Sequence, residues 1–424
     1  MKYGIYYAYW EKQWGADYLK YIEKAARLGF DILEISCAGL RDMTDAQLEM
    51  LRNCKDDKGI RLTGGYGPKA CENLASADSS VVNNALEFWK QTFSALKKLD
   101  VVSVGGGLYS YWPADYSTGV DKRGDFERSV RNMRTLAAMA QDYGITLCME
   151  SLNRHEGYLI NTARECVEYV KAVDAPNVKV MLDTYHMNME EDSFREAILT
   201  AGSLLGHFHA GENNRRLPGQ GNIIPWREIG SALREIDYKD DIVMEPFVIH
   251  GGQVGQDIRI WRDLLEDASE ERLDRDAAES VQFLRDTFEG EPTPIEGLEH
   301  IGLFVSDLAR SVRFYTEVLG FKVIWNNVNP SPEGDIAVTF VQNADCILEL
   351  IRFPNPEKRG AGCFDHVALR VDDLDSVMKK LPHQGVKFEE GSYTEAPQVF
   401  EKGSRWVFLC GPDNERIELN ERFM

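Results

Sequence analysis

The stretch from Val178 to His209 reads VKVMLDTYHMNMEEDSFREAILTAGSLLGHFH. It opens with a short apolar run that ends on Asp183, passes through a helical segment, and closes with a second run from Leu205 to His209. Short runs rich in β-branched and apolar residues are typical of strands, and the residues between them have helical length. The stretch therefore predicts a strand–helix–strand unit with a polar side chain at the end of each strand.

The same alternation continues from the N-terminus to about residue 245 and predicts eight strands. They are expected at Gly4–Tyr7, Asp31–Ser36, Arg61–Gly65, Val101–Gly105, Ile145–Glu150, Val178–Asp183, Leu205–His209 and Asp241–Glu245. Helices are expected between them, for example at Ala16–Leu28, Ala85–Leu99 and Arg128–Tyr143, with a last helix near Arg275–Phe288. Eight such units predict an α/β fold, a TIM (β/α)8 barrel over residues 1–290. A doubly wound open sheet is the alternative.

A break in this pattern marks the predicted domain boundary. Residues 289–297 read EGEPTPIEG, and two prolines with two glycines cannot continue a helix or a sheet. We therefore expect a linker at residues 291–298. The chain then repeats itself, because EHIGLFVSDL at residue 299 matches DHVALRVDDL at residue 365, and each copy ends on a Glu within an apolar run. This repeat predicts an α+β domain of two βαβββ modules over residues 299–424.

The composition limits the classes of function. The formal net charge is −21, which disfavours binding to nucleic acid or to an anionic membrane and favours a neutral small-molecule substrate. No run of about 18 apolar residues occurs, and the N-terminus has no pattern of a cleavable signal. The eight cysteines lack C-x-x-C spacing, so we expect reduced thiols in a cytoplasmic protein.

Four potential metal ligands lie at the ends of four successive predicted strands. They are Glu150, Asp183, His209 and Glu245. The carboxyl ends of the strands form the catalytic rim of a TIM barrel. Three carboxylates and an imidazole suit Mn²⁺, Co²⁺ or Mg²⁺ better than a structural zinc. The alternative is that these residues form separate ion pairs at strand ends.

Several motifs resemble those of the D-tagatose 3-epimerase and D-psicose (D-allulose) 3-epimerase family over residues 1 to about 290. They are YYAYW from Tyr6, GGLYSYWP from Gly106, ESLNR from Glu150, LDTYHMN from Leu182 and MEPF from Met244. The resemblance implies that the four ligands bind Mn²⁺ or Co²⁺ and that Glu150 and Glu245 flank C3 of a ketohexose as the catalytic residues. It also implies that Glu156, His186 and Arg215 hold the O1 to O3 end of the substrate.

This chemistry is physically reasonable. A proton beside a ketone is too weakly acidic for a lone carboxylate, so a Lewis acid must stabilise the enediolate, and inversion needs a base on each face of C3. The resemblance therefore implies an isomerase that interconverts D-fructose and D-allulose or D-tagatose and D-sorbose.

The aromatic residues near the predicted rim have two interpretations: packing residues, which is the commoner case, or an apolar wall beside carbons 4 to 6 of the sugar. They are Tyr6, Tyr109, Tyr111, Trp112 and Phe247. His207 lies two residues before His209 and is expected to face the opposite way, as a packed outer residue.

The repeat over residues 299–424 resembles the vicinal oxygen chelate superfamily, which includes glyoxalase I. The resemblance places a second metal site at His300, Glu349, His366 and Glu418, for Zn²⁺, Ni²⁺, Mn²⁺ or Fe²⁺. Phe304 and Phe353 stand where glyoxalase I enzymes carry glutathione-binding Arg and Asn, which argues against a glutathione substrate. The alternative is a decayed module that serves as a lid or an assembly element.

Two further questions stay open from the sequence. A different barrel reaction, the dehydration of 3-dehydroshikimate, is the alternative to epimerisation, because such enzymes resemble this barrel superfamily and can also carry a vicinal oxygen chelate module. Related barrels are commonly dimers or tetramers, so we expect a homo-oligomer.

Overall fold

The structure is a computed structural model that describes residues 1–117, 119–290, 297–318, 320–355, 364–384, 386–410 and 416–423. The chain forms two compact units, Met1–Glu291 and Pro292–Met424. Residues 291–296 of the predicted linker lie outside the described residues, and residues 297 and 298 already belong to a strand of the second unit. Across the described ranges, no helix is both long and apolar enough to cross a membrane.

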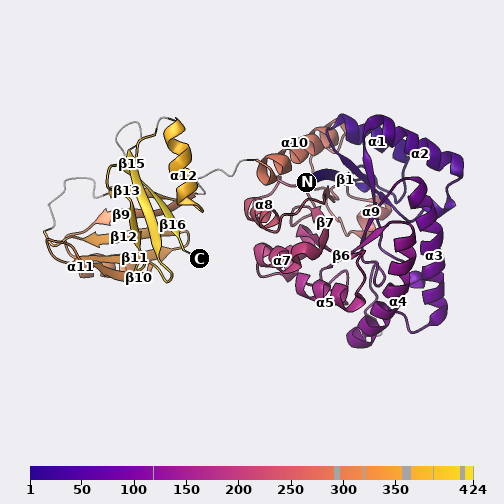
Figure 1. The fold of residues 1–424 in the computed structure, drawn as a ribbon, viewed down its shortest axis with the longest axis horizontal. Helices are drawn as coiled ribbons and strands as arrows, with labels where there is room; N and C mark the ends of the chain where they lie inside the picture. Colours follow the sequence, from indigo (N-terminus) through magenta and orange to yellow (C-terminus); the bar gives the residue numbers. More distant parts are fainter. Residues whose placement is uncertain are drawn as a thin grey trace. The chain divides into compact units, whose positions relative to one another are not determined.

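The N-terminal unit is a closed barrel of parallel strands in chain order, ringed by helices (Figure 1). The strands are β1 (Lys2–Tyr6), β2 (Ile32–Ser36), β3 (Arg61–Gly65), β4 (Ser103–Gly106), β5 (Thr146–Glu150), β6 (Val178–Asp183), β7 (Leu205–Ala210) and β8 (Asp241–Met244). Pairing of β1 with β8, with Lys2 opposite Asp241, closes the barrel. The predicted TIM barrel is therefore confirmed, and an open sheet is excluded.

The helices of this unit are α1 (Tyr18–Arg27), α2 (Asp45–Lys58), α3 (Ser79–Lys98), α4 (Lys122–Asp142), α5 (Ala163–Val173), α6 (Thr184–Glu190), α7 (Phe194–Ala201), α8 (Trp226–Glu235), α9 (Gly252–Asp257) and α10 (Glu270–Phe288). The helices α3, α4 and α10 begin five or more residues before the predicted starts. The reason is capping: the side chains of Asp78, Asp121 and Ser269 each accept a hydrogen bond from an amide of the first turn. A helix thus begins at its polar cap, ahead of its apolar periodicity.

The core of the barrel unit fixes the strand ends on which the candidate site is built. Trp89, Phe93, Tyr169 and Phe208 are fully buried within it. Burial of each such side chain contributes roughly 1.5–3 kcal/mol. Inside the barrel, Gly105 leaves space beside Met181, since a Cβ at Gly105 would lie 2.5 Å from the Met181 sulfur. Large side chains pack around the outside of the strands, and Gly105, which has no side chain, leaves room inside the barrel.

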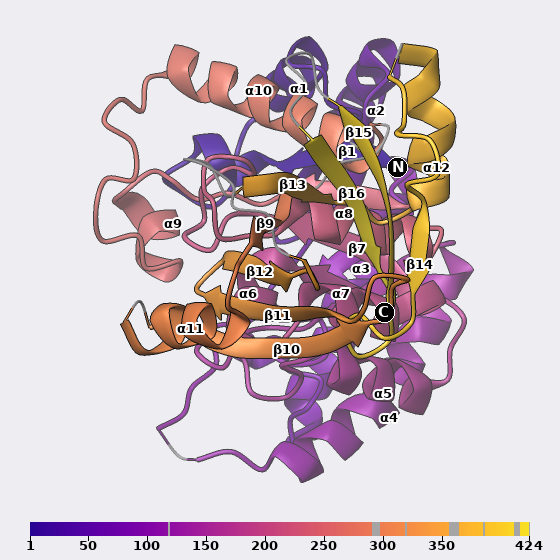
Figure 2. The same cartoon turned by 90° about the vertical axis from the view of Figure 1, so that its left-hand side faces the viewer.

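The C-terminal unit contains two βαβββ modules that share one sheet, as predicted. The first comprises β9 (Gly297–Phe304), α11 (Leu308–Arg313), β10 (Lys322–Asn329), β11 (Ile336–Asn343) and β12 (Cys346–Arg352); the second comprises β13 (Phe364–Arg370), α12 (Leu374–Lys380), β14 (Thr394–Ala396), β15 (Ser404–Cys410) and β16 (Arg416–Arg422). The strand order is β10-β11-β12-β9-β13-β16-β15-β14, so β9 and β13 join the modules (Figure 2). The strand that opens each copy of the sequence repeat therefore lies at the centre of the sheet.

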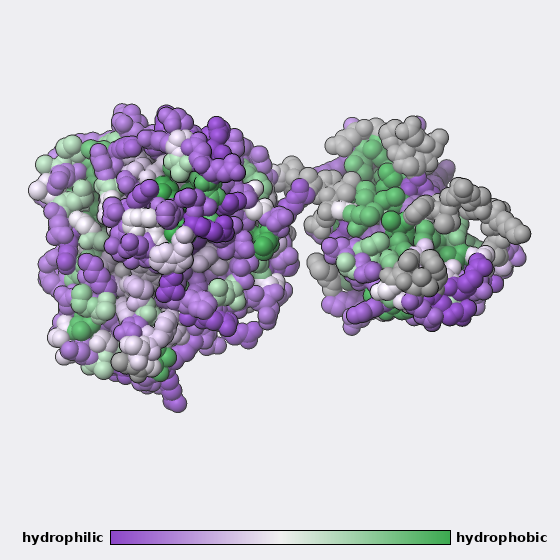
Figure 3. Space-filling model, turned by 180° about the vertical axis from the view of Figure 1, so that it is seen from behind, coloured by the Kyte–Doolittle hydropathy of each residue, from purple (hydrophilic) through white to green (hydrophobic). Residues whose placement is uncertain are grey.

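The surface differs between the two units. On the face drawn in Figure 3 the barrel is mostly hydrophilic, whereas the C-terminal unit shows a broad hydrophobic area. Exposed apolar side chains of the C-terminal unit include Leu298, Val323, Val328 and Val367. A large exposed apolar area often marks an interaction site.

Candidate active site

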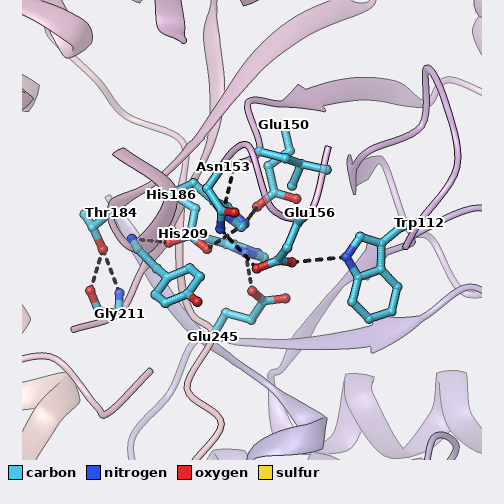
Figure 4. Close-up of polar contacts among 12 residues, drawn as sticks. Trp112, Glu150, Asn153, Glu156, Thr184, His186, His209, Gly211 and Glu245 are labelled. Atoms are coloured by element: carbon cyan, nitrogen blue, oxygen red, sulfur yellow. Dashed lines mark hydrogen bonds and ion pairs between the residues drawn. The ribbon is translucent and has the colours of Figure 1, made fainter. Parts of the chain in front are cut away.

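The four predicted ligands of the barrel meet at its carboxyl-terminal rim. Glu150 ends β5, Asp183 ends β6, His209 lies in β7, and Glu245 follows β8 by one residue. One ligand atom from each of these four residues lies within 4.8 Å of the others. Figure 4 shows Glu150, His209 and Glu245 directed toward the same space. The parallel register of neighbouring strands therefore gathers residues that lie far apart in the sequence.

These residues fit a divalent cation. Glu150 Oε1 and His209 Nδ1 are both buried and make no hydrogen bond. Buried polar atoms without a partner are costly, so an atom of this kind that faces other ligands indicates an ion site. His209 Nδ1 lies 3.6 Å from Glu245 Oε2, close enough for both to contact one ion. The donor set of three carboxylates and one imidazole favours a hard or borderline cation.

The cluster also contains a buried cation of the protein, Arg215. Its Nη1 lies 2.9 Å from both Asp183 Oδ2 and Glu245 Oε2, and its guanidinium stacks 3.7 Å above the ring of Tyr185. Arg215 adopts a left-handed backbone conformation with φ of 65°. Such conformations are costly for residues other than glycine and gather at functional sites. The chain therefore accepts backbone strain to place this charge among the carboxylates.

Burial and neighbouring charges shift the pKa values of Glu150 and Asp183 in opposite directions. Burial raises the pKa of Glu150 well above its ordinary value, and the charge of Glu245 adds to the rise. Burial also opposes ionisation of Asp183, but the neighbouring Arg215 outweighs it and lowers the pKa of Asp183. Without a cation, burial therefore disfavours the charged form of Glu150, whereas Arg215 keeps Asp183 ionised.

The predicted substrate-binding residues are linked by Asn153, which the sequence analysis did not single out. The backbone N–H of Asn153 donates to His186 Nδ1 at 3.1 Å, and its side-chain Nδ2 donates to Glu156 Oε1 at 3.1 Å. Glu156 Oε2 accepts from Trp112 Nε1 at 3.1 Å (Figure 4). Nδ1 of His186 accepts this bond, and Nε2 of the ring lies 3.7 Å from Glu150 Oε1 and 3.5 Å from Arg215 Nη2. Burial lowers the pKa of His186, which favours the neutral ring.

A cavity of about 440 Å³ opens above the cluster. Tyr6, Trp112 and Phe247 line it, together with Trp14. Tyr109 does not: it is buried behind the cavity, where its hydroxyl donates to the backbone oxygen of Glu150 at 2.9 Å. Tyr111 is also absent from the lining. A second cavity of about 470 Å³ shares Trp112, Glu156 and Arg215 with the first, so the two cavities adjoin each other.

The expectation for His207 is wrong. Residues two apart on a strand share a face, so His207 and His209 both project into the barrel. Both imidazoles approach Glu34 of β2: His207 Nε2 lies 3.0 Å from Glu34 Oε2, and His209 Nε2 lies 2.8 Å from Glu34 Oε1. The carboxylates of Glu34 and Glu245 outweigh the effect of burial and raise the pKa of His209 well above its usual value. A charged residue inside an otherwise apolar strand was the available signal for Glu34.

The four candidates of the C-terminal unit also converge. His300 of β9 and His366 of β13 have their Nε2 atoms 3.2 Å apart, and Glu349 Oε2 of β12 lies 3.4 Å from His300 Nε2. Glu418 Oε2 of β16 lies 3.4 Å from His366 Nε2. These four strands are the central ones of the sheet. The arrangement therefore provides a second set of two imidazoles and two carboxylates.

Outer residues hold this second cluster in place. His366 Nδ1 lies 3.0 Å from Asp365 Oδ2, which in turn pairs with Arg416 at 3.1 Å. Asn420 Nδ2 donates to Glu418 Oε1 at 2.7 Å. Partners of this kind orient the ligands of metal sites.

Each of the two units matches a known protein family or superfamily. Residues 22–286 match the xylose isomerase-like TIM barrel family, and residues 297–419 match the glyoxalase/bleomycin resistance protein/dioxygenase superfamily. The D-psicose 3-epimerase of Ruminiclostridium cellulolyticum is 55% identical over 285 residues, which are 67% of this chain and 97% of that protein. A crystal structure of D-psicose 3-epimerase with D-tagatose from Clostridium cellulolyticum H10 has a TM-score of 0.67 and 54% identity, covering 68% of this chain and 99% of the other.

A fusion of a xylose isomerase-like TIM barrel with 4-hydroxyphenylpyruvate dioxygenase shares the fold over 99% of this chain and 66% of its own length, with a TM-score of 0.50 and 18% identity. The two resemblances noted in the sequence are thus confirmed. The chain belongs to the xylose isomerase-like TIM barrel family, with a C-terminal unit that matches the glyoxalase superfamily.

Proposed function

We propose that the barrel unit is a ketose 3-epimerase that inverts C3 of free ketohexoses, with D-fructose/D-allulose and D-tagatose/D-sorbose as substrate pairs. The observation that carries this proposal is the pair Glu150 and Glu245 in one buried cluster at the floor of a sugar-sized cavity. The identity of 55% to a D-psicose 3-epimerase over the whole barrel supports it. The dehydration of 3-dehydroshikimate remains the alternative reaction.

Glu150 and Glu245 are proposed as the two acid/base residues. Inversion requires one carboxylate to take the C3 proton and another group to return a proton from the opposite face. In each direction one Glu acts as the base and the other as the proton donor. The roles exchange in the reverse direction, so each Glu serves as base for one of the two epimers.

Glu156, His186 and Arg215 are proposed to hold the O1 to O3 end of the ketose. His186 presents Nε2 to this space, while Arg215 presents guanidinium donors beside Asp183. Tyr6, Trp112 and Phe247 offer apolar surface to the remaining carbons, and Tyr6 and Phe247 lie edge to face at 6.1 Å. A wall with few hydrogen-bonding groups reads the configuration at C4 to C6 weakly, so a broad range of ketoses is expected.

Glu150, Asp183, His209 and Glu245 are the proposed ligands of a divalent cation, Mn²⁺ or Co²⁺ and also Mg²⁺. When bound, the cation supplies Lewis-acid polarisation of the carbonyl and hydroxyl oxygens of the substrate. The unpartnered His209 Nδ1 and Glu150 Oε1 support this assignment.

The test is incubation of Mn²⁺-loaded protein with D-fructose and with D-tagatose in D₂O. We expect D-allulose and D-sorbose that carry deuterium at C3, and loss of both products in Glu150→Gln and in Glu245→Gln. Conversion without deuterium at C3 would contradict the two-base mechanism. Formation of protocatechuate from 3-dehydroshikimate, with no ketose product, would support the alternative.

The C-terminal unit is proposed as a second metal centre, for Zn²⁺, Ni²⁺, Mn²⁺ or Fe²⁺. The support is that His300, Glu349, His366 and Glu418 converge and that Asp365 and Asn420 orient two of them. We expect His300→Ala combined with Glu349→Ala to remove one equivalent of metal per chain. An unchanged metal content would instead favour a non-catalytic assembly element.

An assembly role for the C-terminal unit would connect it to the proposed homo-oligomer, a dimer or tetramer. Truncation after Glu289 tests this connection, with the mass in solution and the epimerase rate as readouts. A barrel that stays oligomeric and fully active after truncation would exclude a role of the C-terminal unit in assembly. The proposed partner is a small ketose in the cytoplasm.

A further inference from the structure

One buried ionic group of the barrel has no part in the mechanism above. Glu34 lies in the middle of β2 and is 1% exposed, while His207 is 0% and His209 is 2% exposed. Its Oε1 accepts a hydrogen bond from His209 Nε2 at 2.8 Å. Its Oε2 accepts from Thr63 Oγ1 at 2.8 Å and lies 3.0 Å from His207 Nε2. Both oxygens of this carboxylate therefore have partners.

The barrel makes room for this group. A Cβ at Gly65 would lie 3.1 Å from Glu34 Oε1 and 3.3 Å from the ring of Tyr6, so a side chain at residue 65 would crowd both. A carboxylate without charged or hydrogen-bonding partners is very unfavourable in a protein interior, whereas an apolar residue at residue 34 would need none of this arrangement. The cost indicates a function for the carboxylate beyond packing.

The two nitrogens of the His209 ring face opposite groups. Nε2 binds Glu34, and Nδ1 points to the proposed cation site, where Glu245 Oε2 lies 3.6 Å away. A carboxylate only accepts hydrogen bonds, so Glu34 holds the proton of His209 on Nε2. The lone pair of Nδ1 is then available to a cation, and rotation of the ring would break the bond to Glu34.

We propose that Glu34, held by Thr63 and adjacent to His207, is the positioning residue that turns His209 Nδ1 toward the cation. It touches neither the substrate nor the cation. This inference rests on the proposed barrel metal site, and it adds three residues that sequence motifs did not reveal: Glu34, Thr63 and His207.

A competing assignment is a separate cation held by Glu34, His207 and His209 themselves, since one ligand atom of each lies within 4.8 Å of the others. The contacts oppose it. Glu34 Oε1 already hydrogen-bonds His209 Nε2 at 2.8 Å, and Glu34 Oε2 lies 3.0 Å from His207 Nε2, separations that leave no space for an ion between the groups. The stoichiometry of metal binding separates the two assignments.

Glu34→Gln is the decisive variant because it keeps the shape and removes the charge. The amide is a weaker acceptor and can also present its NH₂ to His209, so the preference for a proton on Nε2 is lost. Removal of such outer partners typically weakens metal binding about 10–100-fold. Glu72→Gln is the matched control: Glu72 is a buried carboxylate of the same barrel that accepts from Tyr66 and from the Lys69 amide, and it makes no contact with His209.

Mn²⁺ binding is measured by calorimetry in the full chain with His300→Ala and Glu349→Ala, so that the C-terminal cluster does not contribute. We expect one ion per chain, about 10–100-fold weaker binding in Glu34→Gln, and a change below about twofold in Glu72→Gln. Equal affinity in Glu34→Gln and its parent would overturn the inference. Two ions per chain, one of them lost in Glu34→Gln, would overturn it in favour of the separate cation.

A second measurement needs no variant at residue 34. In the protein loaded with Zn²⁺, NMR of ¹⁵N-labelled histidines should show a slowly exchanging Nε2–H of His209, assigned by its loss in His209→Asn. Metal bound through Nε2, with the proton on Nδ1, would overturn the inference. If the cation binds as described but no ketose is epimerised, the proposed function fails and the inference stands; if ketoses are epimerised but Glu34→Gln has no effect, the inference alone fails.

Discussion

Replacing Arg215 by methionine should destabilise the cation-free protein far more than the loaded one. Methionine keeps most of the length of the side chain and removes the charge that lies 2.9 Å from both Asp183 and Glu245. Arg215 is 3% exposed, so solvent does not screen this loss. Removal of one partner from a buried ionic group costs about 3–5 kcal/mol. At about 2–4 °C per kcal/mol, the thermal midpoint of the barrel should fall by roughly 6–20 °C.

A bound divalent cation supplies positive charge to the same carboxylates, so Mn²⁺ should recover more than half of this loss. The assay is thermal unfolding in EDTA and in excess Mn²⁺, with Arg195→Met as the control. Arg195 forms a partly exposed ion pair with Glu235 at 2.5 Å, and such pairs contribute about 0–1 kcal/mol. An Arg215→Met variant that is destabilised equally with and without Mn²⁺, or no more than Arg195→Met, would refute the reasoning.

Three further outcomes are expected. Trp112→Phe removes the N–H that donates to Glu156, and a hydrogen bond to a charged group contributes about 1.5–3 kcal/mol. KM should therefore rise about tenfold or more while kcat changes little. Trp226→Phe is the control: it loses a similar hydrogen bond to Glu212 and should leave KM unchanged. In EDTA, the urea midpoint of unfolding should fall as the pH drops below about 4. Arg215 lowers the pKa of Asp183 beneath its ordinary 3.8, so the stability that ionised Asp183 contributes is present above that value and is lost as the pH falls through the folded pKa. This loss should be smaller in Arg215→Met. Chelation of the cation should abolish epimerisation and lower the thermal midpoint, and free Mn²⁺ at about 100 times its Kd should restore about 2.7 kcal/mol; an activity that survives exhaustive chelation would contradict the metal site.

Strand positions in the barrel were predicted to within two residues at every end, because β-branched and apolar runs bounded by polar residues mark buried strands directly. Helix starts were predicted less well. The beginnings of α3, α4 and α10 depend on single capping side chains at Asp78, Asp121 and Ser269, which precede any apolar periodicity. Local hydrogen bonding, which a periodic pattern does not contain, sets these ends.

Side-chain direction was the weaker part of the site prediction. His207 was assigned to the outside although its spacing from His209 places both on the same face of β7. For Tyr109 the sequence left packing and the sugar wall open, and the structure packs it against Tyr169 at 5.7 Å behind Glu150. The loop after β4 decides its position, and loop geometry does not follow from strand periodicity.

The sequence by itself determined the order of strands and helices, the two units and the polar residues at the ends of β5 to β8. These features are local, because each depends on residues adjacent in the chain. Only the tertiary structure decided that Glu34 meets His209 across 175 positions, that Asn153 links Glu156 to His186, and that Arg215 lies between Asp183 and Glu245. Barrel closure and a strained loop conformation create these contacts, and both depend on packing among residues that are distant in the sequence.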